Sequence, residues 1–409
     1  MTRRPVMVLT VSMLTMESLS LLFIQRILVL LLSILLNLNP ILAYSLKNCT
    51  IDYSGNSLAV LFVDCSNRKL LTVPDDVPRD VNSVQLFNNL LEEINRKDFE
   101  KLSKLELLYL QNNQIAHIDD ESFISLGALK MLNMTNNQLT NLTAKVFQGL
   151  SNLTKLDLSS NNIHFIHPST FHFLTSLQTV VLDGNWLRQI SDIKSILQLS
   201  NLRELSIIFN KFSSFETKDL RLNVSLGLKL LNVSHNKLDR FSITTPIFPH
   251  LETIDLSRCG QAGGLKWDIP NRTLLKNITN LYFGATVIPF EDIRKVLQSL
   301  DSLIHLRLNH MGESINKGVL STVCKRPTLR RLDLTHNNVS VLRMKLHTCS
   351  QLNELDLSYT DMTELSKGSI RSMKRLRSLK AKNNLLTEVP EDIRSLSFLR
   401  ILDLSDNLI

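Results

Sequence analysis

Hydrophobic positions recur along the chain in one pattern, L-x-x-L-x-L-x-x-N-x-L, whose copies begin 23 to 27 residues apart between residues 81 and 409. Fourteen copies are present, and those beginning at Leu251, Ile278 and Leu303 are the weakest. The spacing of two within L-x-x-L-x-L predicts a short strand that turns its leucines inward and its third and fifth residues outward. The clear copies are Val81–Leu91, Leu105–Ile115, Leu129–Leu139, Leu153–Ile163, Leu177–Leu187, Leu202–Phe212, Leu228–Leu238, Leu329–Val339, Leu352–Met362, Leu376–Leu386 and Leu399–Ile409.

This repetition predicts the architecture, because one short strand cannot bury its leucines alone. Stacked repeats pair their strands into a parallel sheet over one continuous core, so we expect an α/β leucine-rich repeat solenoid, a curved horseshoe with a parallel β-sheet on the concave face. Asn fills the ninth position in ten copies, where its amide can satisfy backbone groups of the turn. Cys259, Thr286, Met311 and Thr360 replace it, and we expect an irregular turn at Met311.

A row of aromatic residues accompanies the repeats: Phe99, Phe123, Phe147 and Phe171 lie 24 residues apart. We expect this row to pack inside the convex side of the solenoid. An exposed aromatic stripe that binds a ligand is the alternative. The segment 388–396 departs from this pattern, and Pro390 stiffens its turn.

Residues 1–45 have the layout of a secretory signal peptide. Arg26 precedes the ten-residue apolar run 27–36, which is shorter than the ~20 residues of a membrane span. The alternative is an uncleaved anchor that also uses the apolar patches at 6–14 and 19–24. Nine glycosylation sequons favour passage through the secretory pathway: Asn48, Asn133, Asn141, Asn152, Asn223, Asn232, Asn271, Asn277 and Asn338.

Five cysteines are too few for a disulfide scaffold and lack the spacings of a zinc site. Cys49 and Cys65 lie in a segment, 46–80, that we expect to cap the first repeat, and an oxidising compartment favours a disulfide between them. Cys324 and Cys349 precede adjacent strands, so they form either a second disulfide or two separate thiols. Cys259 is expected to be a buried thiol.

The last repeat stops at Ile409, inside the motif and without a C-terminal cap. We therefore expect a signal peptide at 1–45, a cysteine-containing cap at 46–80, and fourteen repeats at 81–409 with the last one incomplete. The chain is then a fragment or a truncated product. Membrane attachment is expected only through a missing C-terminal part.

These features together resemble the ectodomain of a Toll-like receptor, in particular the vertebrate branch with receptors thirteen, twenty-one and twenty-two. The resemblance rests on the signal peptide, the two-cysteine cap from Lys47 to Cys65, 24-residue repeats with Phe spacers, irregular middle repeats and many sequons. It implies a receptor that binds microbial ligands and pairs with itself or with a related receptor. By this resemblance, the chain is expected to be the sensing part of such a receptor.

The sequence gives no support to an enzyme. It contains no G-x-S-x-G, no H-E-x-x-H and no phosphate-cradling glycine loop, and we expect no cofactor and no metal ion.

The net charge of +8 is concentrated in residues 324–382, which hold 13 Lys and Arg and 5 Asp and Glu. Such a cluster can attract phosphates, and neighbouring histidines gain charge in an acidifying vesicle. We therefore predict an acid-enhanced site for an anionic ligand such as nucleic acid. A solvated basic surface is the alternative. The candidate residues are His305, Arg307, His310, Arg331, His336, Lys380 and Lys382.

The predicted function is that of an innate immune pattern-recognition ectodomain, extracellular or in the endosomal lumen. A secreted decoy or matrix protein without signalling is the alternative. Asn133 and Asn232 occupy outward strand positions, so glycans there are expected to cover the concave face at repeats three and seven.

Overall fold

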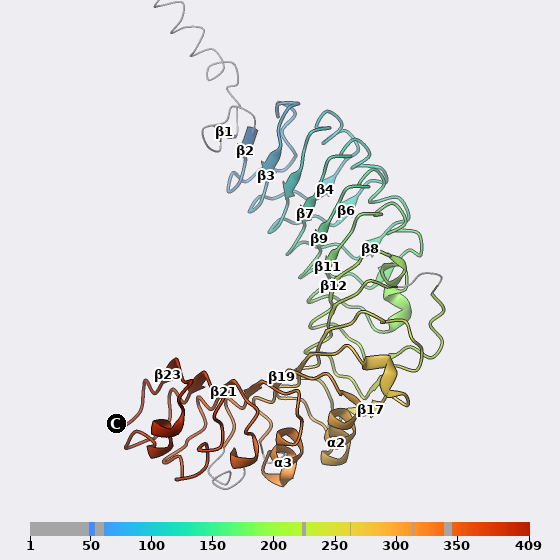
Figure 1. Cartoon of the computed structure of the whole chain (residues 1–409). Coiled ribbons are helices and arrows are strands. Elements are labelled where there is room, and N and C mark those ends of the chain that lie inside the picture. The colour runs from blue at the N-terminus through green and yellow to red at the C-terminus, as the bar shows by residue number, and fades with distance from the viewer. Residues whose placement is uncertain (1–48, 54–60, 223–225, 262, 313–314, 339–345) are drawn as a thin grey trace, which may run out of the picture.

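The computed structural model describes residues 49–53, 61–222, 226–261, 263–312, 315–338 and 346–409. The predicted signal peptide at 1–45, Asn48 and Asn223 lie outside this part. The chain is a curved solenoid whose inner, concave surface is a continuous sheet (Figure 1). The prediction of a leucine-rich repeat horseshoe is confirmed.

The concave sheet has sixteen strands. Its first strand, β1 (Thr50–Tyr53), pairs antiparallel with β2 (Leu61–Asp64), and every later pair is parallel. Each later strand holds three residues, the third to fifth positions of its repeat. These strands are β3 (Ser83–Gln85), β5 (Leu107–Tyr109), β7 (Met131–Asn133), β9 (Lys155–Asp157), β11 (Thr179–Val181), β12 (Glu204–Ser206), β14 (Leu230–Asn232), β16 (Thr253–Asp255), β18 (Asn280–Tyr282), β19 (His305–Arg307), β20 (Arg331–Asp333), β21 (Glu354–Asp356), β22 (Ser378–Lys380) and β23 (Ile401–Asp403).

The outer, convex side varies along the chain (Figure 1). Short parallel pairs form between β4 (Glu93–Ile94) and β6 (His117–Ile118), and between β8 (Asn141–Leu142) and β10 (Phe165–Ile166). A three-stranded sheet follows, made of β13 (Ser214–Glu216), β15 (Arg240–Ser242) and β17 (Lys266–Asp268). The helical elements are η1 (Ile190–Ile193), η2 (Ile196–Gln198), η3 (Arg272–Leu275), α2 (Phe290–Ser299), η4 (Ile315–Val319), α3 (Leu320–Cys324), η5 (Leu346–Thr348) and η6 (Glu391–Ser395).

The core fills the space between these two sides. The middle residue of each strand is buried from β3 to β22, as the pattern predicts. The phenylalanine row packs inside, which confirms the core reading: Phe99 and Phe123 stack with ring centroids 5.9 Å apart, and Phe147 lies 5.9 Å from Phe171. The exposed aromatic stripe is therefore excluded for these four residues.

The repeat asparagines form a buried ladder that joins neighbouring turns. Asn161 shows the arrangement: its Nδ2 donates to the carbonyls of Met134 and Leu158, each at 3.0 Å, and its Oδ1 accepts from the amide of Leu139 at 3.0 Å. Two of these three partners belong to the preceding repeat. The ladder thus satisfies backbone groups that stacking removes from water.

The replacements at this position differ in what they can bond. Thr286 Oγ1 donates to the carbonyl of Leu256 at 2.6 Å, and the Sγ of Cys259 donates to the carbonyl of Val233 at 3.3 Å. Met311 has no such group, and the π-helix η4 begins shortly after it. The turn keeps the left-handed residue of the other repeats, at His310, and the departure from the regular pattern is the π-helix in the segment that follows.

The structure pairs Cys49 with Cys65 and Cys324 with Cys349. Cys259 is a free thiol, and its burial raises its pKa to about 12. Among the described helices, none has the length and apolar character that crossing a membrane demands.

Candidate ligand-binding site on the concave face

Strands β19 to β22 present two rows of side chains on the concave surface. Successive residues of a strand point to opposite faces, so the first and third residues of each strand face the solvent and the middle leucine faces the core. The parallel register places equivalent residues side by side. One row is His305, Arg331, Glu354 and Ser378, and the other is Arg307, Asp333, Asp356 and Lys380.

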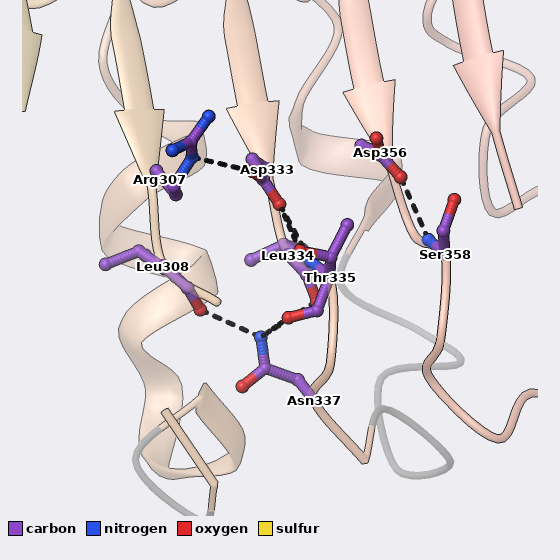
Figure 2. Close-up of polar contacts among 8 residues, drawn as sticks. All are labelled: Arg307, Leu308, Asp333, Leu334, Thr335, Asn337, Asp356 and Ser358. Carbon is purple, nitrogen blue, oxygen red and sulfur yellow. Dashed lines mark hydrogen bonds and ion pairs between the residues drawn. The ribbon is translucent and has the colours of Figure 1, made fainter. Parts of the chain in front are cut away.

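The two arginines of these rows are paired across strands. The Nε of Arg307 lies 2.9 Å from the Oδ2 of Asp333, and the Nε of Arg331 lies 3.0 Å from the Oε1 of Glu354 (Figure 2 shows the first pair). The Arg307 guanidinium also lies over the ring of Tyr282, 4.9 Å from its centroid. Neighbouring strands are ~4.8 Å apart, which brings side chains of adjacent repeats within bonding distance.

The carboxylates are held in place by the turns that follow their strands. Asp333 Oδ1 accepts from the backbone amide of Thr335 at 3.0 Å and from its hydroxyl at 2.8 Å. Asp356 Oδ1 accepts from the amide of Ser358 at 3.0 Å, as Figure 2 also shows. Asp333 therefore links the turn of its own repeat to the arginine of the preceding one.

These residues line a hollow of about 150 Å³. It contains three cations, Arg307, Arg331 and Lys380, and three carboxylates, Asp333, Glu354 and Asp356. The hollow is thus close to neutral, although the segment that supplies most of it carries a charge of +8. This surface carries charges of both signs, so it differs from the predicted basic cluster: acidic residues of neighbouring repeats lie in the same rows as the cations.

His305 borders the hollow and packs edge-on against Tyr282, with ring centroids 5.2 Å apart. Burial lowers its pKa, and the charges of Arg307 and Arg331 lower it further. His305 therefore becomes charged at a more acidic pH than an exposed histidine does.

The structure divides the seven candidate residues into two groups. His305, Arg307, Arg331 and Lys380 line the hollow. His310, His336 and Lys382 lie beyond the C-terminal ends of the strands, in the turns. Lys382 Nζ lies 3.2 Å from the Oδ2 of Asp406.

Sequence reasoning missed the acidic and aromatic members of the site, Asp333, Glu354, Asp356 and Tyr282. The signal was present, because each of them occupies the same repeat position as a candidate residue on the adjacent strand. Comparing successive repeats position by position would have found all four.

Two of the predicted glycosylation sites lie on the concave sheet. Asn133 ends β7 and Asn232 ends β14, and both are half-buried. Their Oδ1 atoms accept from the amides of Thr135 and Ser234, each at 3.0 Å. The other described sequon asparagines are exposed: Asn141, Asn152, Asn271, Asn277 and Asn338.

The fold agrees with a match to a family model described as leucine rich repeat, which covers residues 79–139, 134–187, 327–386 and 350–409. The matched residues are repeats of the leucine-rich repeat solenoid described above.

Curated proteins similar in sequence include osteomodulin and asporin. Rat osteomodulin is 27% identical over 220 residues, which cover 53% of this chain and 48% of osteomodulin. Bovine asporin is 31% identical over 83 residues, which cover 20% of this chain and 22% of asporin. The matched region spans about half the length of osteomodulin and less of asporin.

Solved structures with a similar fold include a Leptospira interrogans leucine-rich repeat protein, LIC12759, with a TM-score of 0.59 and 24% identity over 85% of this chain and 90% of that one. The TLR13–ssRNA13 complex gives a TM-score of 0.50 with 20% identity, over 89% of this chain and 68% of that one. At these identities the likeness concerns the fold.

Proposed function

We propose that this chain is the ligand-binding ectodomain of an innate immune pattern-recognition receptor. It is proposed to be related to the branch of the Toll-like receptors that contains receptors thirteen, twenty-one and twenty-two. It acts by binding rather than by catalysis, in the extracellular space or the endosomal lumen. The observation that carries the proposal is the hollow across β19 to β22, where arginines and carboxylates are held at fixed cross-strand positions.

The proposed ligand is a microbial anion, specifically a single-stranded nucleic acid. Each arginine has five N–H donors. The ion pairs of Arg307 with Asp333 and of Arg331 with Glu354 each involve the Nε atom. Their side chains are 44% and 55% exposed, so a phosphate can approach the remaining donors. A TLR13–ssRNA13 complex shares the fold, which supports this ligand class by analogy.

Acidification is proposed to strengthen binding. Protonation of His305 adds a positive charge beside Arg307 and Arg331, where an anionic ligand would lie. Because the pKa of His305 is lowered, this gain comes below the pH at which an ordinary histidine titrates.

Binding of fluorescent single-stranded RNA and DNA to the purified protein, at pH 5.5 and 7.4, tests this proposal. We expect tighter binding at pH 5.5, and a loss of binding in the variant Arg307→Ala/Arg331→Ala/Lys380→Ala. The matched control is Lys130→Ala/Lys155→Ala/Lys229→Ala, which removes three exposed cations from other repeats. Equal binding at both pH values, or none at either, would overturn the acid-enhanced anion site.

Dimerisation is part of the proposal, because the resembling receptors act in pairs. A ligand that engages two copies is expected to double the molar mass measured by light scattering. A constant mass at saturating ligand contradicts dimerisation through this part of the chain.

The second candidate is a secreted matrix-type protein without signalling, favoured by the sequence similarity to osteomodulin and asporin. Sequencing the transcript beyond the codon for Ile409 separates the two. Further repeats followed by a membrane helix and a signalling domain support the receptor, and an immediate stop codon supports the secreted protein.

A further inference from the structure

A second row of side chains runs along the C-terminal edge of the concave sheet, at the eighth position of each repeat. Every residue here that is not glycine adopts a left-handed backbone conformation, with φ between +51° and +59° from Asn88 to Asp406. The shared conformation directs successive side chains in parallel. From the seventh to the twelfth repeat the row reads His235, Arg258, Ala285, His310, His336 and Tyr359.

Flat side chains in this row stack face to face. The His310 and His336 rings are 4.4 Å apart with an interplanar angle of 9°, and the His336 and Tyr359 rings are 4.5 Å apart at 13°. Phe209 and His235 lie 4.1 Å apart in the same row. The step between rings is close to the ~4.8 Å spacing of the strands, so the solenoid itself sets the spacing of the stack.

Ala285 interrupts this stack. The backbone continues unbroken through it, because the amide of Arg258 donates to Gly284 O and the amide of Ala285 donates to Asn309 O, each at 2.7 Å. Arg258 and His310 are therefore two strand spacings apart, roughly 9.6 Å, with a single methyl group between them. The pKa of His310 reflects this closeness. Burial lowers that pKa most, the neighbouring His336 lowers it next, and the charge of Arg258 lowers it further.

We propose that the slot over Ala285, between Arg258 and His310, binds one unpaired base of a single-stranded nucleic acid. A planar ring there continues the stack: it lies on the His310 imidazole on one side and under the Arg258 guanidinium on the other. Histidine rings and guanidinium planes are surfaces on which unpaired bases stack. The proposed slot takes one ring, since a single alanine replaces one larger side chain of the row.

The choice of a nucleobase rests on charge and on neighbouring surfaces, and it depends on the proposed function above. The guanidinium of Arg258 attracts the face of an aromatic ring, and its positive charge also favours a ligand that carries negative charge. Tyr282, three residues before Ala285, ends β18 beside Arg307 of the hollow. A strand of nucleic acid with its phosphates in the hollow can therefore place a base in the slot at the adjoining edge.

The test places an aromatic side chain of the protein in the proposed slot by substituting Ala285. Ala285→Tyr is compatible with the backbone, because Tyr359 has the same left-handed conformation in the same row. Ser160→Tyr is the control, since Ser160 has the same left-handed conformation but lies far along the row; it is exposed, whereas Ala285 is half-buried. The probe is a single-stranded oligonucleotide that carries 2-aminopurine, whose fluorescence falls when it stacks, together with an otherwise identical abasic one.

We expect the wild-type protein to quench the fluorescence of 2-aminopurine. Ala285→Tyr should bind the oligonucleotide roughly ten-fold more weakly, because it loses one base stack. The abasic oligonucleotide should bind wild type and variant equally, and Ser160→Tyr should behave as wild type. Tight binding without quenching, or binding unaffected by Ala285→Tyr, overturns the slot and leaves the hollow intact. Absence of oligonucleotide binding at every pH overturns the slot and the nucleic-acid ligand together.

Discussion

Arg307 on β19 and Asp333 on β20 form an ion pair, with Nε and Oδ2 2.9 Å apart, at the same position of two successive repeats. Asp333 is also fixed by two hydrogen bonds from Thr335. Asp333 thus holds the guanidinium of Arg307 in place and partly neutralises its charge. A phosphate that binds Arg307 has to compete with this carboxylate.

Removing that competitor should strengthen anion binding. Asp333→Asn keeps a carbonyl oxygen for the Thr335 amide, as Asn133 does for Thr135 in its own repeat. We expect the affinity for single-stranded RNA, measured by fluorescence anisotropy at low salt, to rise roughly three- to ten-fold.

The control for this variant is Asp157→Asn. Asp157 accepts from the Ser159 amide in the equivalent turn on β9, far from the hollow. Similar gains in both variants indicate a general charge effect and count against a specific role for Arg307.

Loss of one ladder asparagine should destabilise the solenoid strongly. Asn161→Ala leaves three buried backbone groups without their partner, so we expect the free energy of unfolding to fall by about 2–5 kcal/mol. Urea denaturation measures this. Asn162→Ala, at the exposed neighbouring position, should change it by less than ~0.5 kcal/mol. Equal effects of the two variants contradict the ladder.

The ladder was predictable from sequence because the period alone places each asparagine above the next. The same logic predicted the outward strand residues, from Gln85 to Asp403. The ion pairs were not predicted, since charge was counted along the segment 324–382 rather than across strands. Asp333 and Glu354 belong to that segment, yet their effect depends on which cation each one meets.

Other features depend on packing that the repeat pattern does not contain. The three-stranded convex sheet stacks Phe215 on Phe241 and Phe241 on Trp267, both with ring centroids 5.4 Å apart. These repeats deviate from the Phe-spacer pattern of the first four, so the sequence offered no template for them. The stack of His310, His336 and Tyr359 depends on rotamers, which a sequence pattern does not specify.

Stability is expected to fall on acidification, partly through His305. Its pKa is lowered in the folded state by burial and then by Arg307 and Arg331, so the unfolded chain binds the proton more readily. The stability that neutral His305 contributes is fully present above ~6.5, its pKa in the unfolded chain. It is lost as the pH falls from there through the lower pKa of the folded state. His305→Gln should therefore reduce the drop in thermal midpoint between pH 7.5 and pH 5. An unchanged drop in this variant contradicts the role of His305.

The disulfide between Cys324 and Cys349 should contribute to stability. It closes a loop with a sequence separation of 25, for which the chain-entropy relation gives about 3.5 kcal/mol. We expect a lower midpoint of urea denaturation for Cys324→Ala/Cys349→Ala than for the wild type.

Thiol counting gives an independent check on the cysteines. Denatured, unreduced protein should react with one equivalent of iodoacetamide, at Cys259. Reaction with three equivalents, seen by intact-mass measurement, shows that a disulfide is open.

The location of the ligand tests the account most directly. Single-stranded RNA containing 4-thiouridine, bound at pH 5.5 and irradiated, will attach to the residues it touches, and mass spectrometry of the peptides identifies them. We predict attachment within residues 280–382, where β18 to β22 and their turns carry the hollow. Attachment confined to the convex side, or to strands β3 to β14, contradicts a binding site on this part of the concave face.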